Sequence, residues 1–201
     1  MTLSIFLVRH GESEANTRNM IVSDRFDPQL TERGRQDTKS LAQKWLEQPV
    51  RAIYTSPLAR TMETAQIWAD SLHIDTVHSD DRLHEIHLGA FDGHLIDDLV
   101  QNQFQDYDRW KLDPESPPQD GEKLSAVWER MHEFLLMVSQ RYEKGLVIGI
   151  THADCLKAVT LGILRAPWTS AQYVHFANVA GLLVEHLDDH FQLHALPLIP
   201  L

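Results

Sequence analysis

The feature that most constrains the fold is an alternation of short apolar runs with longer segments of helical periodicity. Three runs stop abruptly at polar residues, as buried strands do: residues 3–8, 52–55 and 146–150. Segments around them carry apolar side chains three and four residues apart, which predicts helices. Strands that alternate with helices build a sheet with both faces covered. We therefore expect one α/β domain over residues 1–201, with a mostly parallel central sheet and helices on both faces.

Capping residues and prolines predict where the helices begin. Thr31 is expected to cap a helix that reaches about Leu46, and Ser56 with Pro57 to open one that ends near Leu72. Further helices are predicted over residues 95–110, 123–142 and 153–164.

Two regions fall outside this alternation. Residues 113–118 are rich in proline, which predicts a loop, so residues 95–118 form an insertion that we expect to cover the active site. Residues 173–196 are expected to form two or three strands. The chain shows no internal repeat or linker, which supports a single domain.

Composition excludes several classes of function. The formal net charge of −11 argues against nucleic-acid binding, which needs a Lys/Arg surface. No apolar stretch approaches the length of a membrane helix. A single cysteine, Cys155, rules out an internal disulfide and suits a reducing compartment, so a cytoplasmic location is expected. A phosphate site in so acidic a chain must concentrate a few cations locally.

Cations and imidazoles accompany the ends of the three predicted strands. Arg9 and His10 follow the first strand, Arg60 lies in the first turn after the second, and His152 comes just after the third. Ligands of open α/β sheets bind outside the carboxyl ends of the strands, so these side chains should surround one pocket. Arginine forks pair with phosphate oxygens, and helix N-termini add N–H donors. The pattern predicts a phosphate site.

The same residues suit the transfer of a phosphoryl group. A neutral imidazole is a competent nucleophile near pH 7, and His10, next to Arg9, is the predicted nucleophile. Two arginines and a protonated His152 can neutralise the phosphoryl oxygens in place of a metal ion. A carboxylic acid is also needed, to protonate the leaving oxygen.

Each of these residues also has a less specific interpretation. Taken alone, His10 is consistent with a buried structural histidine, and Arg60 with a solvated helix charge. Other histidines have the spacing of metal ligands: His84, His87, His186, His190 and His194. They fall in predicted loops, strands and turns, where this spacing does not bring imidazoles together as it does on a helix. A metal site is therefore not expected.

Five segments in order resemble the histidine phosphatase (phosphoglycerate-mutase-like) superfamily. They are Leu7–Ser13 with Asn16, Asp27–Thr31 with Gly34, Ser56–Ala65, Leu83–Gly89 with Phe91–Gly93, and Gly121–Glu122 with the strand into His152. The resemblance extends from about Leu3 to Asn178, nearly the whole chain. Five ordered blocks are a specific signal, whereas Arg-His-Gly alone is a weak one.

The resemblance implies a metal-independent phosphatase without a cofactor, acting on a small phosphorylated metabolite through a phosphohistidine. It places the acid on Glu85, with Asp80, Asp81 and Asp92 as competitors. The implied catalytic residues are Arg9, His10, Arg60, Glu85 and His152. The implied phosphate-binding residues are Arg9, Asn16, Ser23, Arg60, His152 and Ala153.

The chain departs from the family pattern at a few positions. Ala153 stands where many members have glycine, and Lys123 where serine often follows Gly-Glu. The family's phosphomutases carry an Arg-Arg pair in the insertion, and residues 108–113 contain no such pair. This favours a phosphatase over a phosphoglycerate-type mutase, although Arg109 and Lys111 keep the mutase open. A non-catalytic phosphate-binding scaffold predicts loss of catalytic residues, and all are present. The oligomeric state is not predicted.

Overall fold

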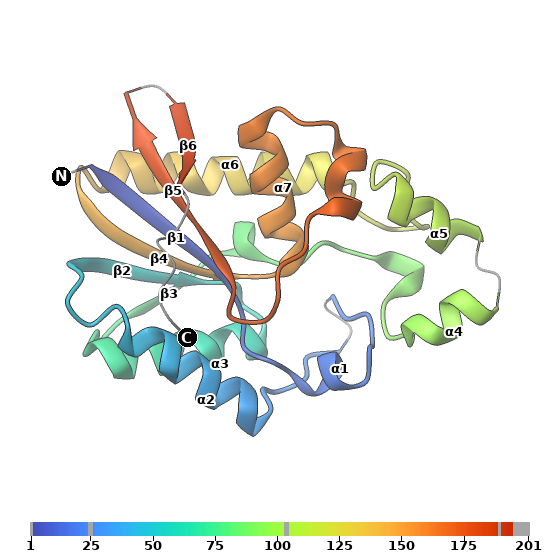
Figure 1. The fold of residues 1–201 in the computed structure, drawn as a ribbon, viewed down its shortest axis with the longest axis horizontal. Coiled ribbons are helices and arrows are strands. Elements are labelled where there is room, and N and C mark those ends of the chain that lie inside the picture. Colours follow the sequence, from blue (N-terminus) through green and yellow to red (C-terminus); the bar gives the residue numbers. More distant parts are fainter. Residues whose placement is uncertain (1, 24–25, 103–104, 189, 195–201) are drawn as a thin grey trace.

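A six-stranded sheet forms the centre of the protein (Figure 1). The computed structural model describes residues 2–23, 26–102, 105–188 and 190–194. The strands are β1 (Leu3–Arg9), β2 (Val50–Thr55), β3 (Val77–Ser79), β4 (Gly145–Thr151), β5 (Gly181–Leu187) and β6 (His190–His194). Their order is β3-β2-β4-β1-β5-β6; the first four are parallel, β5 is antiparallel to β1, and β6 is antiparallel to β5. The mostly parallel α/β sheet is confirmed.

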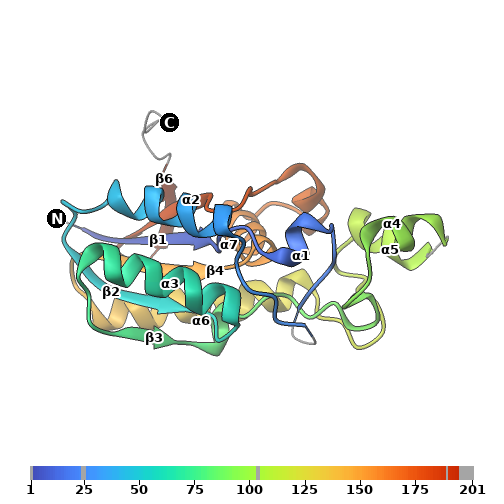
Figure 2. The same ribbon diagram turned by 90° about the horizontal axis from the view of Figure 1, so that it is seen from below.

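Helices cover both faces of the sheet (Figure 2). They are α1 (Glu14–Thr17), α2 (Glu32–Gln43), α3 (Ala59–Leu72), α4 (Ile96–Gln101), α5 (Gln105–Leu112), α6 (Leu124–Arg141) and α7 (Ala153–Leu164). Short 3₁₀ turns span Asp81–Leu83, Gly89–Phe91 and Trp168–Tyr173. Helices α2 and α3 pack together on one face, and α6 and α7 on the other. Within the described residues, no helix is both long and apolar enough to cross a membrane.

Side chains that alternate along β1 divide the core between the two faces. Phe6 and Val8 belong to the cluster that contains Trp45 and Trp68, on the side of α2 and α3. Leu7 belongs to the cluster built with α6 and α7. Since both faces of β1 are buried, close packing fixes the position of the strand in the sheet. It also fixes the backbone of Arg9, at the carboxyl end of the strand.

The predicted helix start at Ser56 is wrong. Helix α3 begins at Ala59 with Leu58 as its N-cap, because the Ser56 amide still donates to the Ile150 carbonyl at 3.0 Å and so extends the strand. Asp27 caps the start of the helix instead, since its Oδ2 accepts a hydrogen bond from the Ala59 amide at 2.6 Å. The Ser56 hydroxyl is thereby available for a contact elsewhere.

Other predicted boundaries differ less. The helix capped by Thr31 ends at Gln43, so that Leu46 lies beyond it and is 53% exposed. The predicted helix over residues 95–110 consists of α4 and α5, and residues 103–104 between them lie outside the described part of the chain. The tail contains β5 and β6, and the predicted strand residues 195–196 also lie outside that part.

Gly34 allows α2 to approach the loop that follows β1, and this contact can be tested. A Cβ at this position would lie 2.7 Å from the Glu12 amide nitrogen, a backbone atom that cannot move alone. Although alanine favours helix, we expect Gly34→Ala to lower the free energy of unfolding by about 1–3 kcal/mol through overpacking. Thermal unfolding should show a lower midpoint. Lys39→Ala, at an exposed position of the same helix, is the control; equal midpoints for the two variants would contradict the close approach.

Candidate active site

The carboxyl ends of the parallel strands border a cavity of about 580 Å³. The end of β1, residues 16–22, the start of α7 and residues 175–178 contribute to its walls. Figures 1 and 2 show α4 and α5 beyond this end of the sheet. The insertion adds four side chains to the lining: Ile96, Tyr107, Trp110 and Lys111. The cavity therefore joins the predicted phosphate site to the predicted insertion.

His10 presents a basic nitrogen to this cavity. The residue is 3% exposed, and its Nδ1 lies 2.7 Å from the Gly11 carbonyl oxygen, which can only accept a hydrogen bond. Nδ1 therefore carries the proton, and Nε2 keeps its lone pair. Burial, then the charges of Arg60 and Arg9, lower the pKa of His10 well below its usual value. A neutral imidazole with a free Nε2 is suited to nucleophilic attack.

His152 packs against His10, with ring centroids 5.2 Å apart. Its Nε2 lies 2.9 Å from the Ser56 hydroxyl oxygen, and both residues are fully buried. Its Nδ1 has no hydrogen-bond partner among the described residues and lies 3.9 Å from Oε2 of Glu85. Burial, then the charge of Arg60, lower the pKa of His152 well below its usual value. Burial therefore favours the neutral form of His152 in the site without phosphate.

Two arginines bring unpaired donors to the cavity. Arg60 is 1% exposed, and neither its Nε nor its Nη1 has a hydrogen-bond partner in the described part of the chain; Nη1 lies 3.6 Å from Oδ1 of Asp27. Arg9 donates from Nη1 to the Phe176 carbonyl at 2.7 Å, and its buried Nε has no such partner there. Buried donors without partners are costly. A bound oxyanion would satisfy them, with the fork geometry that arginine offers.

Glu85 lines the same cavity and is suited to donate a proton. Its Oε1 accepts the Ile86 amide at 3.0 Å. Burial, then the negative charge of Asp154, raise the pKa of Glu85 to about 7. A carboxyl group with that pKa carries a proton in a large fraction of molecules near neutral pH. Its competitor Asp80 is instead engaged in an ion pair with Arg82 at 2.6 Å.

Asn16 is oriented by neighbours that occupy its oxygen. Oδ1 of Asn16 accepts from the amide and the hydroxyl of Ser13 at 3.0 and 3.1 Å, and from Nδ2 of Asn178 at 3.0 Å. Asn178 also donates to the His10 carbonyl at 3.2 Å. Asn16 lines the cavity, so its NH₂ group is the part left for a ligand. Ala153, the first residue of α7, lines the cavity as well.

Ser23 lies beside Arg60, with its polar groups engaged inside the protein. Its amide donates to Oδ1 of Asp92 at 2.7 Å, its hydroxyl accepts the Leu88 amide at 3.4 Å, and its carbonyl accepts from Arg60 at 3.4 Å. The next residues, 24–25, lie outside the described part of the chain. The structure thus gathers the other predicted site residues around one cavity: Arg9, His10, Asn16, Arg60, Glu85, His152 and Ala153.

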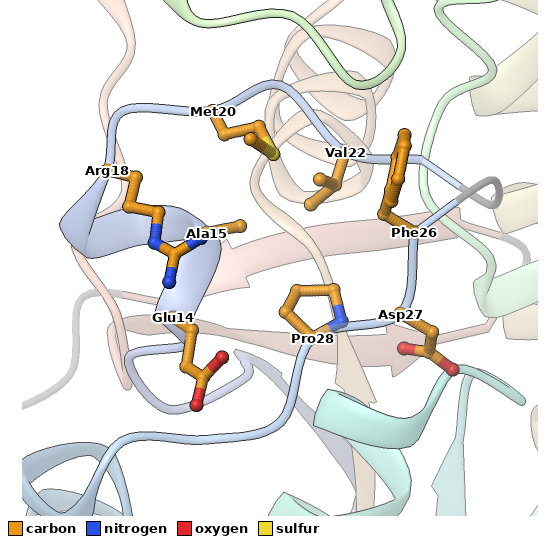
Figure 3. A pocket seen from close by; sticks show the side chains of 8 residues that line it. All are labelled: Glu14, Ala15, Arg18, Met20, Val22, Phe26, Asp27 and Pro28. Atoms are coloured by element: carbon orange, nitrogen blue, oxygen red, sulfur yellow. The ribbon is translucent and has the colours of Figure 1, made fainter.

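Sequence reasoning did not identify the residues that hold these groups in place: Asp27, Ser56 and Asn178. Figure 3 shows the Asp27 carboxylate directed toward the start of α3, where it meets the Ala59 amide and approaches Arg60. The cavity drawn there, of about 360 Å³, shares Met20 and Val22 with the main cavity. The Asp27–Thr31 segment was part of the resemblance, but its pairing with Arg60 depends on the fold.

The histidines with metal-like spacing are distributed over the protein. Contrary to the expectation from the sequence, His84 and His87 do come together outside a helix, stacked with centroids 5.0 Å apart, and Nδ1 of His84 lies 3.0 Å from the Glu85 carbonyl oxygen. His194 contacts Glu185 on the neighbouring strand at 3.0 Å. Over the residues that the structure describes, no three His, Cys, Asp or Glu side chains gather as metal ligands would.

The hydrogen bond between Ser56 and His152 should set how well the site binds phosphate. In Ser56→Ala the His152 ring loses the contact that orients Nδ1. We expect the Kd for inorganic phosphate to rise on the order of tenfold, the usual worth of one buried hydrogen bond. Calorimetry measures the Kd, and nitrogen NMR of the imidazole reports the His152 tautomer. Ser40→Ala, which removes an exposed hydroxyl from α2, is the control. An unchanged Kd together with an unchanged imidazole spectrum would contradict this role.

Comparisons with known proteins agree with this geometry. The profile of the histidine phosphatase superfamily (branch 1) matches residues 5–198. The chain is 32% identical to phosphoserine phosphatase 1 of Hydrogenobacter thermophilus, over 81% of this chain and 76% of that protein. It is 29% identical to the probable phosphoglycerate mutase GpmB of Serratia proteamaculans, over 92% and 85% of the two chains.

Solved structures show the same fold. YhfR of Bacillus stearothermophilus superposes with a TM-score of 0.88 at 29% identity, over 95% of both chains. Phosphoserine phosphatase of Entamoeba histolytica, solved with 3-phosphoglyceric acid, gives 0.84 at 25% identity, over 96% of this chain and 95% of that one. The signature residues, the cavity they line and the match over nearly the whole length agree: the chain belongs to the histidine phosphatase superfamily.

Proposed function

We propose that this protein is a metal-independent phosphomonoesterase that releases inorganic phosphate from a small phosphorylated metabolite through a phosphohistidine at His10. One observation carries the proposal: a neutral His10 with a free Nε2 lies among buried arginine donors that have no partner, in a cavity that also holds Glu85 with a pKa of about 7. Nucleophile, oxyanion donors and proton donor therefore share one space.

The first half of the reaction forms the covalent intermediate. Arg9, Arg60 and the Asn16 amide bind the phosphoryl oxygens, and Nε2 of His10 attacks phosphorus in line with the leaving oxygen. As the P–O bond breaks, Glu85 gives its proton to that oxygen, and the alcohol departs. In the second half the Glu85 carboxylate takes a proton from water. The resulting hydroxide attacks phosphorus, the P–N bond breaks, and phosphate leaves.

His152 takes part once the substrate has entered. The negative charge of the phosphoryl group favours the protonated imidazole and so opposes the burial that keeps His152 neutral in the free site. With Nε2–H donated to Ser56, Nδ1–H then donates to a phosphoryl oxygen. We assign the Ala153 amide at the start of α7 to the same oxygens. Ser23 is proposed to act on the phosphate through Arg60, because the Ser23 carbonyl accepts a hydrogen bond from Nη2 of Arg60.

A phosphoglycerate-type mutase is the second candidate, because relatives of that name match most of the chain. A mutase must return the phosphoryl group to a sugar acid and exclude water from the phosphohistidine. The insertion contributes Lys111 to the cavity but no arginine pair, which favours the phosphatase. We also propose a cytoplasmic location. It suits Cys155, which is buried and forms no disulfide.

Loss of the nucleophile should abolish turnover. We expect His10→Ala to release no phosphate from a monophosphorylated substrate, while the wild type releases it without a bisphosphate primer. Rapid quenching of the wild type should trap a protein-bound phosphoryl group that is labile to acid and stable to alkali. His94→Ala, far from the nucleophile along the chain, controls for the removal of an imidazole. Primer-dependent isomerisation with negligible phosphate release would favour the mutase, and wild-type turnover by His10→Ala would contradict the covalent mechanism.

Glu85 should matter most when the leaving group is poor. Proton donation contributes on the order of 10²–10⁴ in rate, so Glu85→Gln should reduce kcat for an alkyl phosphate by that factor and spare nitrophenyl phosphate. The wild-type kcat/KM for the alkyl ester should fall as pH rises through about 7, where the free enzyme loses the Glu85 proton. It should hold well below pH 6.5, because the lowered pKa keeps His10 neutral there. Asp80→Asn is the control; equal losses on both esters in Glu85→Gln would contradict the acid role.

A further inference from the structure

Asp154 and Lys157 form an ion pair in the wall of the active-site cavity that the proposed reaction does not use. They lie one helical turn apart on α7, with Nζ of Lys157 2.8 Å from Oδ1 of Asp154. Both line the cavity, and their side chains are only 24% (Lys157) and 17% (Asp154) exposed. The pair thus presents a fixed negative and a fixed positive charge side by side to whatever occupies the cavity.

A carboxylate at this position is unfavourable for a purely anionic substrate. Asp154 lies two residues after His152, so it repels both the phosphoryl group and any second anion nearby. As an acidic residue in the first turn of α7 it favours the helix dipole, but that role does not require it to face the cavity. Its charge is useful to a ligand when the ligand itself carries a cation.

The charges that line the cavity fit a leaving group with both signs. Arg9 and Arg60 are matched by the phosphoryl dianion. Glu85 is the proposed proton donor. Lys157 and Asp154 then remain, with the exposed Lys111, whose ammonium lies 5.5 Å above the Tyr107 ring. An α-amino acid carries its ammonium and its carboxylate on a single carbon, and therefore matches two opposite charges that lie next to each other.

The spacing along α7 suits a short leaving group. At a rise of about 1.5 Å per residue, Asp154 lies about 3 Å and Lys157 about 7.5 Å beyond His152 along the helix axis. A phosphoryl group at His152 and the carbon that carries the ammonium and the carboxylate, placed near the pair, are then separated by a few bonds. Leu88, Ile96 and Trp110 line the cavity with apolar surface, which leaves the pair as a polar anchor on the α7 wall.

We propose that Asp154 and Lys157 bind the ammonium and the carboxylate of the leaving group, so that the substrate is the phosphate ester of a hydroxylated α-amino acid. The proposal rests on the phosphatase function proposed above. It makes both residues determinants of specificity: a hydroxy acid in place of the amino acid offers Asp154 no substrate ammonium, and an amino alcohol offers Lys157 no substrate carboxylate.

Three small esters test the two contacts separately. O-phosphoserine carries both charges, 3-phosphoglycerate has a hydroxyl in place of the ammonium, and phosphoethanolamine lacks the carboxylate. We expect the wild-type kcat/KM for O-phosphoserine to exceed that for each of the other two by at least about tenfold, the usual worth of one hydrogen bond to a charged group. Nitrophenyl phosphate, which carries neither charge, reports the phosphatase reaction itself.

Two variants should change these preferences in different ways. Asp154→Asn should lower the ratio of kcat/KM for O-phosphoserine to that for 3-phosphoglycerate by roughly 10- to 100-fold. Lys157→Met keeps the length of the stem and should lower the ratio of O-phosphoserine to phosphoethanolamine by a similar factor. Ratios are needed because Asp154 also influences the Glu85 proton, and that effect is common to the three alkyl esters. Asp37→Asn, which breaks an exposed ion pair on α2, is the matched control and should leave both ratios unchanged.

The possible outcomes separate this inference from the function on which it rests. If the wild type hydrolyses nitrophenyl phosphate but prefers 3-phosphoglycerate or phosphoethanolamine to O-phosphoserine, the zwitterion site is wrong and the phosphatase stands. If Asp154→Asn lowers kcat/KM for all three alkyl esters by one factor, Asp154 acts through Glu85 or the helix, and the inference is again overturned. If the wild type releases phosphate from none of the esters, the phosphatase itself fails. A fall in the ratio of O-phosphoserine to 3-phosphoglycerate in Asp154→Asn, together with a fall in the ratio of O-phosphoserine to phosphoethanolamine in Lys157→Met, would establish the site.

Discussion

The pairing of β1 with β4 is the constraint on which the site depends. The two parallel strands are in register with Arg9 opposite Thr151, and the His10 amide continues the ladder by donating to the Thr151 carbonyl at 3.0 Å. His10 and His152 therefore follow the strands at the same level, and their rings meet. A slip by one residue would point one of the two side chains to the opposite face. The core on both faces of β1 prevents such a slip, so packing far from the cavity sets the geometry inside it.

Burial then decides the protonation states. The loss of water favours the neutral forms of His10 and His152 and the protonated form of Glu85, and it is the largest cause of all three pKa shifts. The arginines stay charged, because a guanidinium does not lose its proton in proteins. One environment thus gives the proposed nucleophile, the proposed acid and the two arginines the charge states that the proposed reaction needs. The unpaired donors of the arginines make the free site costly, and a bound oxyanion should stabilise the folded protein through mass action.

The leaving group meets a different set of elements. The proposed phosphoryl contacts come from strand ends and from the first turns of helices, which pack on the sheet. The far wall comes from α5 and from the side of α7 that carries Asp154 and Lys157. Since these elements do not set the position of His10, their side chains can differ without loss of the phosphoryl site. In the proposed reaction, the phosphoryl group and the leaving group are thus bound by different elements of one fold.

The sequence by itself predicted the parallel sheet, the helices on its two faces and the chemistry at the strand ends, because buried strands, capping residues and strand-end cations are local signals. It misplaced the start of α3, where Ser56 has the residue type of an N-cap but is held in the ladder by Ile150. It could not predict that Ser56 orients His152, that Asp27 approaches Arg60 or that Asn178 holds Asn16. Those contacts join residues far apart in the chain, and only tertiary packing brings them within hydrogen-bond distance. The charge states were likewise decided by the fold, because desolvation depends on what surrounds a side chain and not on its neighbours in sequence.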